Sequence, residues 1–177
     1  TRLQVEHGVT EQVWGVDLVA WMLRLAAGEL PPHAELAARL SPAGHAIQAR
    51  VYAEDPARDF RPSPGLLTEV AFPPADGRRL RIDTWVEAGC EIPPSFDPMI
   101  AKLIAHAPDR EAARAALDRA LAATRLYGVE TNRDYLRQIL ADAPFAGGEP
   151  WTRCLEGLAC SSHTVEVLAA GTQSTVQ

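Results

Sequence analysis

Proline and glycine interrupt residues 44–105 so often that only short strands fit between them. The pairs Pro73-Pro74, Asp76-Gly77 and Pro93-Pro94 favour turns, because proline fixes φ and glycine accepts a positive φ. The stretches between these breaks predict strands over residues 45–52, 66–72, 80–86 and 99–105. Several short strands separated in this way are typical of an antiparallel sheet or a small barrel.

Helical patterns flank these strands, over residues 16–27, 110–124, 131–140 and 151–158. The first pattern is apolar on most sides, so we expect a largely buried helix that ends at Gly28. The second follows Asp109, a good N-cap residue, and the third opens with a capping-box spacing at Thr131. The whole predicts an α+β fold, in which short antiparallel strands form a sheet or small barrel-like core with flanking helices.

Composition limits the function classes. The chain has 177 residues and a formal net charge of −6, which fits one domain or one domain plus a short extension. It has neither an apolar run of the ~20 residues that span a membrane nor a basic stripe with aromatic residues, so we expect no membrane and no nucleic-acid partner. The absence of an initiator Met and of a signal peptide predicts a fragment of a longer cytoplasmic polypeptide.

Cysteine and histidine spacings give no sign of a metal centre. The three cysteines, Cys90, Cys154 and Cys160, lack the C-x-x-C spacing, and we expect reduced thiols. The five histidines are scattered, so we expect no metal site within this chain.

Polar and apolar residues alternate over residues 2–6, which predicts a strand with Arg2, Gln4 and Glu6 on one face. A guanidinium suits a small oxyanion, an amide can hydrogen-bond the same ligand, and a carboxylate can accept a proton from it. The alternative is a solvated sheet face with ordinary Arg–Glu pairing.

A second arginine, Arg50, lies in the predicted strand 45–52, where a surface ion pair with Glu54 or Asp55 is the alternative to a functional role. The chain has no glycine-rich phosphate loop, and its only lysine, Lys102, is not in a Met-Lys-Met biotin-acceptor context. The chain therefore neither supplies a complete nucleotide site nor carries biotin itself.

The opening residues 1–11 have the sequence T-R-L-Q-V-E-H-G-V-T-E, which resembles the catalytic strand motif N-T-R-[IL]-Q-V-E-H-[PG]-V-T-E of the biotin carboxylases. These enzymes are ATP-grasp ligases. The resemblance continues, in family order, through residues 44–56, 60–65, 96–103 and 128–132. It implies that residues 1–160 are a biotin carboxylase C-terminal domain, whose residues 1–11 complete the ATP-grasp active site.

Two details narrow the resemblance to urea carboxylase or the urea amidolyase fusion. Gly8 stands where most biotin carboxylases have proline, and urea carboxylases typically have glycine there. The tail resembles the opening of the carboxyltransferase domain of urea carboxylase, which implies that residues 161–177 are a linker and the start of that domain.

The resemblance also implies roles for single residues. Arg2 and Gln4, with the backbone N–H of Val5, would hold bicarbonate, and Glu6 would be the general base that deprotonates it. Arg2, Glu6 and Arg50 would be catalytic, Arg50 by stabilising the enolate-like anion of biotin. Bicarbonate is a far weaker acid than a free glutamic acid, whose pKa is about 4.3, so the proton moves only if the carbonate charge is stabilised nearby.

The implied cofactors are biotin, on a separate carrier domain, and ATP with Mg²⁺, bound mainly by residues upstream of this chain. The implied partners are bicarbonate, the biotin carrier domain, the upstream ATP-grasp domain and the downstream carboxyltransferase domain. The complete enzyme would convert urea to allophanate, and the isolated fragment would be inactive. The alternatives are the biotin carboxylase part of an acyl-CoA or pyruvate carboxylase, and a non-catalytic scaffold or dimerisation module.

Overall fold

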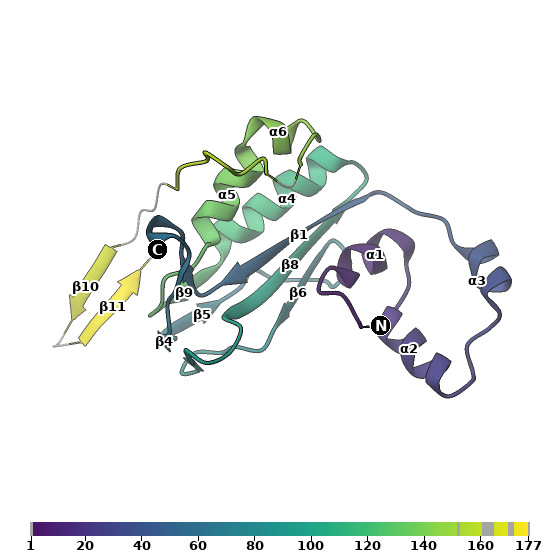
Figure 1. Cartoon of the computed structure of the whole chain (residues 1–177), viewed down its shortest axis with the longest axis horizontal. Coiled ribbons are helices and arrows are strands. Elements are labelled where there is room, and N and C mark those ends of the chain that lie inside the picture. Colours follow the sequence, from purple (N-terminus) through teal and green to yellow (C-terminus); the bar gives the residue numbers. More distant parts are fainter. Residues whose placement is uncertain (1, 152, 161–164, 170–171, 177) are drawn as a thin grey trace.

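A three-stranded antiparallel sheet forms the centre of the molecule (Figure 1). Its strands lie in the order β1 (His45–Tyr52), β8 (Met99–Ala107) and β6 (Leu80–Thr84). This computed structural model describes residues 2–151, 153–160, 165–169 and 172–176. The strands predicted at 45–52, 80–86 and 99–105 are therefore confirmed, with ends that differ by a few residues.

One face of this sheet packs against helix α4 (Arg110–Ala123) and forms the core. Leu103 of β8 and Val51 of β1 are fully buried, and they join Leu117 and Leu121 of α4 in one apolar cluster. The alternation of small and apolar residues along β1 and β8 explains this face, because every second side chain points to it.

In the chain, the strands of the central sheet are followed by helix α4, then α5 (Arg133–Ala141) and the short α6 (Ala143–Ala146). The predicted N-cap of α4 is confirmed, because the Asp109 side chain accepts a hydrogen bond from the backbone N–H of Ala112 at 2.8 Å. Thr131, the predicted cap residue of α5, accepts a hydrogen bond at Oγ1 from the backbone N–H of Arg133 at 3.4 Å, and the helix begins at Arg133. Asn132, which occupies the N-cap position, makes no side-chain cap bond. That side chain instead bonds to strand β1.

Shorter strand pairs surround the central sheet. They are β2 (Glu54–Asp55) with β3 (Arg61–Pro62), β4 (Gly65–Leu66) with β7 (Glu91–Ile92), β5 (Glu69–Ala71) with β9 (Arg125–Tyr127), and β10 (Val165–Ala169) with β11 (Thr172–Val176). A 3₁₀ turn, η1 (Pro56–Arg58), follows β2. The predicted strand 66–72 is thus two short strands. Gly128 follows β9 with φ +105°, and a Cβ there would lie 2.0 Å from the carbonyl oxygen of Leu66, so this turn requires glycine.

Three helices precede the sheet: α1 (His7–Trp14), α2 (Leu18–Ala26) and α3 (His33–Arg39), which lie together at the right of Figure 1. The strand predicted over residues 2–6 is wrong, because no described strand pairs with it and the chain turns into α1 instead. The burial predicted for the second helix is also wrong. None of the residues of α2 is buried, and Leu23 and Leu25 are 68% and 65% exposed.

Two further predictions concern the end of the chain. Over residues 151–158 the described residues form turns rather than the predicted helix. The predicted linker at Ser161-Ser162 lies outside the described residues. No helix among the described residues has both the length and the apolar character needed to cross a membrane.

Candidate active site

Glu6 and Arg50 meet at the surface of the central sheet. Arg50 Nη2 donates a hydrogen bond to Glu6 Oε2 at 2.8 Å, and the two side chains are 38% and 55% exposed. Glu6 precedes α1 but does not cap it with its side chain, which leaves its carboxylate available to Arg50. The alternative of Arg50 pairing with Glu54 or Asp55 is not what the structure shows, since Asp55 pairs with Arg58.

Helix α1 lies close against the strands and holds Glu6 in place. Glu11, which is only 8% exposed, accepts a hydrogen bond from Arg81 Nη1 of β6 at 2.5 Å and another from the backbone N–H of Leu18 at 2.7 Å. A Cβ at Gly8 would lie 2.3 Å from Ile104 Cδ1 of β8, which shows how near the helix comes to the sheet. These contacts fix the segment that presents the Glu6 carboxylate.

A carboxylate on β6 extends this network. Asp83 accepts hydrogen bonds from Arg81 Nε at 2.7 Å and Arg81 Nη2 at 2.9 Å, and it pairs with Lys102 Nζ at 3.0 Å. Burial by itself would raise the pKa of Asp83, but the hydrogen bonds and charges of Arg81 and Lys102 outweigh it and lower that pKa. Hydrogen bonding to Asp83 likewise raises the pKa of Arg81.

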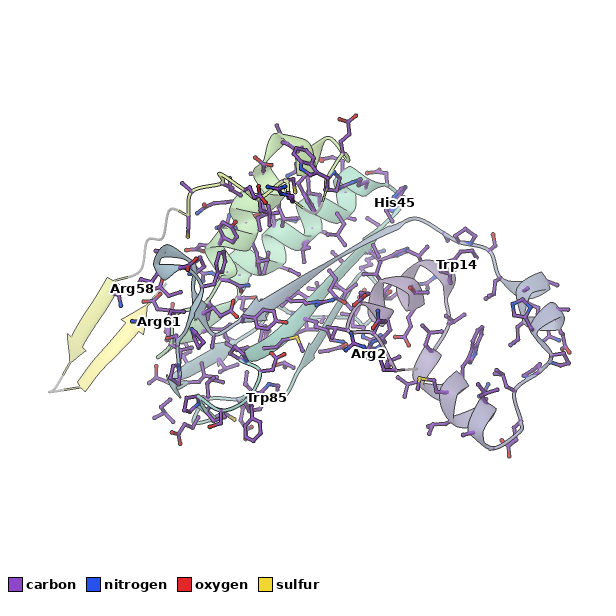
Figure 2. The ribbon with its side chains drawn as sticks, viewed as in Figure 1. Arg2, Trp14, His45, Arg58, Arg61 and Trp85 are labelled. Carbon is purple, nitrogen blue, oxygen red and sulfur yellow. The ribbon has the colours of Figure 1, made fainter. Side chains whose placement is uncertain are left out.

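Arg2 and Gln4 lie beside this site but do not join the ion pair. Both line a cavity of about 430 Å³ together with Glu6, and residues of α2, including Trp21 and Met22, form its apolar wall. Within the described residues, no hydrogen bond links the side chain of Arg2 or Gln4 to Glu6 or Arg50. Figure 2 shows Arg2 next to α1, on the opposite side of the molecule from Arg58 and Arg61.

The structure therefore brings together two of the predicted site residues, Glu6 and Arg50, and places Arg2 and Gln4 in the adjoining cavity. Val5 is half-buried and is not among the residues that line this cavity. A second cavity of about 430 Å³ is lined by Glu6, Arg50 and Gln48. The Glu6 carboxylate thus borders two spaces large enough for a small anion.

Sequence reasoning missed the network of Glu11, Arg81, Asp83 and Lys102. The alternation of Arg81 and Asp83 in a predicted strand signals one charged face, but alternation does not give the register between strands. Among the described residues, no three His, Cys, Asp or Glu side chains converge to hold a metal ion. Cys90, Cys154 and Cys160 are free thiols.

The comparison with known families decides the family question. Residues 48–157 match the family model described as the biotin carboxylase C-terminal domain. This chain belongs to that family. Residues 1–33 match a second model, the ATP binding domain of the carbamoyl-phosphate synthase L chain.

Three relatives show the degree of similarity. The urea amidolyase of Lachancea kluyveri is 45% identical over 176 residues, which are 99% of this chain and 9% of that protein. The alpha subunit of mitochondrial methylcrotonoyl-CoA carboxylase from Rattus norvegicus is 44% identical over 86% of this chain and 21% of its own length. The crystal structure of Kluyveromyces lactis urea carboxylase superposes with a TM-score of 0.86 at 45% identity, over 95% of this chain and 14% of that one.

These comparisons confirm the family predicted from the motifs, and its closer likeness to the urea enzymes. They also confirm the α+β fold, with small antiparallel sheets and flanking helices. The chain spans only about a tenth of the length of the urea amidolyases that it matches.

Proposed function

We propose that this chain is the C-terminal part of a biotin carboxylase, which carboxylates biotin with ATP and bicarbonate within a urea carboxylase that forms allophanate. The observation that supports this most strongly is the contact of Glu6 with Arg50, because it joins two separate segments of the family motif at 2.8 Å. The likeness to urea amidolyase over 99% of the chain supports the choice of substrate.

In this proposal Glu6 is the general base, and it accepts a proton from bicarbonate bound in the cavity that Arg2 and Gln4 line. The guanidinium of Arg2 and the backbone N–H of Val5 stabilise the carbonate charge that develops. Protonation of Glu6 removes the charge that holds Arg50, so Arg50 becomes free to stabilise negative charge on the ureido oxygen of biotin. One proton transfer to Glu6 therefore both produces carbonate and frees Arg50 to stabilise biotin.

Bound ATP with Mg²⁺ would supply the phosphoryl chemistry that activates carbonate. The sequence lacks a phosphate-binding glycine loop, and no described cluster of acidic or histidine side chains fits a metal ion. We therefore assign ATP and Mg²⁺ to other parts of the polypeptide and derive no step of this chain through them. Arg50 would contact biotin in this proposal, with the biotin carrier on a separate domain.

We further propose that residues 1–160 form the biotin carboxylase C-terminal domain and that residues 161–177 lead into a carboxyltransferase domain. The partners are then an ATP-grasp domain, a biotin carrier domain and a carboxyltransferase domain of the same polypeptide, which we place in the cytoplasm. The length of the matched relatives supports a multidomain enzyme, since this chain is 9% of the urea amidolyase of Lachancea kluyveri.

The substrate is tested with the full-length enzyme. We expect ATP cleavage that requires bicarbonate and biotin, and allophanate formation from urea. Turnover with an acyl-CoA or pyruvate but not with urea would contradict the choice of substrate. Near-normal biotin-dependent ATP cleavage by both Glu6→Ala and Arg50→Ala variants would instead favour the non-catalytic scaffold.

A further inference from the structure

The central sheet places three charged residues in one row. In the antiparallel ladders, Lys102 of β8 lies directly opposite Arg50 of β1 on one side and opposite Asp83 of β6 on the other. Directly opposite residues of an antiparallel pair share a face, with Cβ atoms about 5 Å apart. The face that presents Arg50 to Glu6 therefore also presents Lys102 and Asp83.

This row puts two cations side by side. Like charges directly opposite each other repel, so each cation needs a carboxylate of its own. Arg50 has Glu6 at 2.8 Å, and Lys102 has Asp83 at 3.0 Å. The Lys102 side chain is only 12% exposed, so water can replace a lost carboxylate poorly.

Asp83 itself is fixed on its strand. Both of its oxygens accept hydrogen bonds from Arg81, at 2.7 and 2.9 Å, which is the strong two-point geometry of an arginine with a carboxylate. Arg81 also reaches Glu11 on α1. Arg81 therefore holds the Asp83 carboxylate in place independently of Lys102. The position of this carboxylate determines where the lysine ammonium lies.

We propose that Asp83 is a positioning residue of the reaction site, which retains Lys102 so that Arg50 stays the partner of Glu6. This inference rests on the proposed function, because it assumes that Glu6 and Arg50 are the reacting pair. Without the Asp83 charge, the long flexible side chain of Lys102 turns to Glu6 and competes with Arg50. A lysine ammonium on the Glu6 carboxylate then occupies the oxygens that would accept the proton and opposes the role of Glu6 as a base.

The test uses the full-length enzyme with the substitution Asp83→Asn, because the amide oxygen can still accept a hydrogen bond from Arg81. We expect the kcat of bicarbonate- and biotin-dependent ATP cleavage to fall about tenfold, with the KM for ATP unchanged. Adding Lys102→Met to this variant removes the competing cation, and we expect most of the lost kcat to return. The matched control is Asp118→Asn, which breaks the 2.8 Å pair of Asp118 with Arg137 between α4 and α5 and should leave kcat unchanged.

Three outcomes would overturn the inference. A kcat of wild-type size in Asp83→Asn would show that Asp83 positions nothing. A loss in Asp83→Asn that Lys102→Met does not restore would show that Asp83 acts only through the fold. If the wild-type enzyme itself lacks bicarbonate-dependent ATP cleavage, the proposed function is wrong and the inference falls with it, so the two failures are distinguishable.

Discussion

The Glu6–Arg50 ion pair lies on the surface, where water and salt screen its charges, so its contribution to folding is small. Exposed ion pairs typically contribute about 0–1 kcal/mol to stability. We therefore expect Arg50→Ala to lower the free energy of unfolding of this chain by less than about 1 kcal/mol, measured by urea denaturation. Glu69–Arg125, a 2.7 Å pair of similar exposure, provides the matched control Arg125→Ala. A much larger loss for Arg50→Ala alone would give Arg50 a structural role.

Glu54 is a residue whose charge opposes folding. Burial raises the pKa of Glu54, and the nearby Asp97 charge raises it further. Since the folded state disfavours the ionised carboxylate, Glu54→Gln should raise the Tm at pH 7. The gain should vanish below the ordinary pKa of 4.5, where the carboxyl is protonated in both states. Thermal unfolding at pH 7 and pH 4 checks this, and an equal gain at both values would refute it.

At the scale of elements, the sequence predicted features that depend on neighbouring residues, such as a helix cap. It did not predict whether a segment would find another strand or surface to pack against. The N-cap at Asp109 follows from residue type alone, and the structure confirms it. The strand over residues 2–6 failed because alternation does not show whether another strand is present to accept its hydrogen bonds. The apolar helix α2 was predicted to be buried because its residues are apolar on most sides, but burial also needs a surface to pack against.

Asn132 shows how tertiary contacts replace a local cap. Its side chain accepts a hydrogen bond from the backbone N–H of Tyr52 at 2.9 Å and donates one to the carbonyl of Arg50 at 3.1 Å. Asn132 therefore ties α5 to the edge of β1, at the residue that meets Glu6. The family resemblance over residues 128–132 includes Asn132, but only the structure shows that its side chain bonds to Tyr52 and Arg50.

We expect Asn132→Ala to destabilise the chain more than Asp109→Ala does. Loss of the Asn132 side chain leaves two part-buried backbone groups of β1, the N–H of Tyr52 and the carbonyl of Arg50, without these partners. An unsatisfied buried group costs about 1–3 kcal/mol. Loss of the Asp109 cap costs about 1 kcal/mol. Chemical denaturation of both variants measures the difference, and an Asn132→Ala variant as stable as Asp109→Ala would contradict the proposed link between α5 and β1.

At the scale of the whole molecule, the described fold leaves several apolar side chains of α2 exposed. Met22, Leu23 and Leu25 are each at least half exposed, which is typical of a surface that packs against another protein part. These residues lie within the segment that matches an ATP binding domain. That residues 1–11 complete an active site with another part of the polypeptide stays a prediction from the sequence motifs, whereas the exposed side chains of α2 were found only in the structure.

The isolated chain should therefore lack the complete reaction. We expect no bicarbonate-dependent ATP cleavage from residues 1–177 alone, because the proposed function assigns ATP and Mg²⁺ to other parts of the polypeptide. A phosphate-release assay on the purified chain, with the full-length enzyme as the positive control, measures this. Turnover by the isolated chain would show that ATP binds to residues that we have not assigned.

The most direct test of Glu6 as the proton acceptor is the rate of bicarbonate-dependent ATP cleavage by a full-length Glu6→Gln variant. Glutamine keeps the size and a hydrogen-bonding oxygen for Arg50 but cannot act as a base at neutral pH. We predict a loss of about 100-fold or more in kcat, as general-base removal typically causes, beside a Glu69→Gln control of normal activity. A Glu6→Gln rate equal to that of the control would contradict the account.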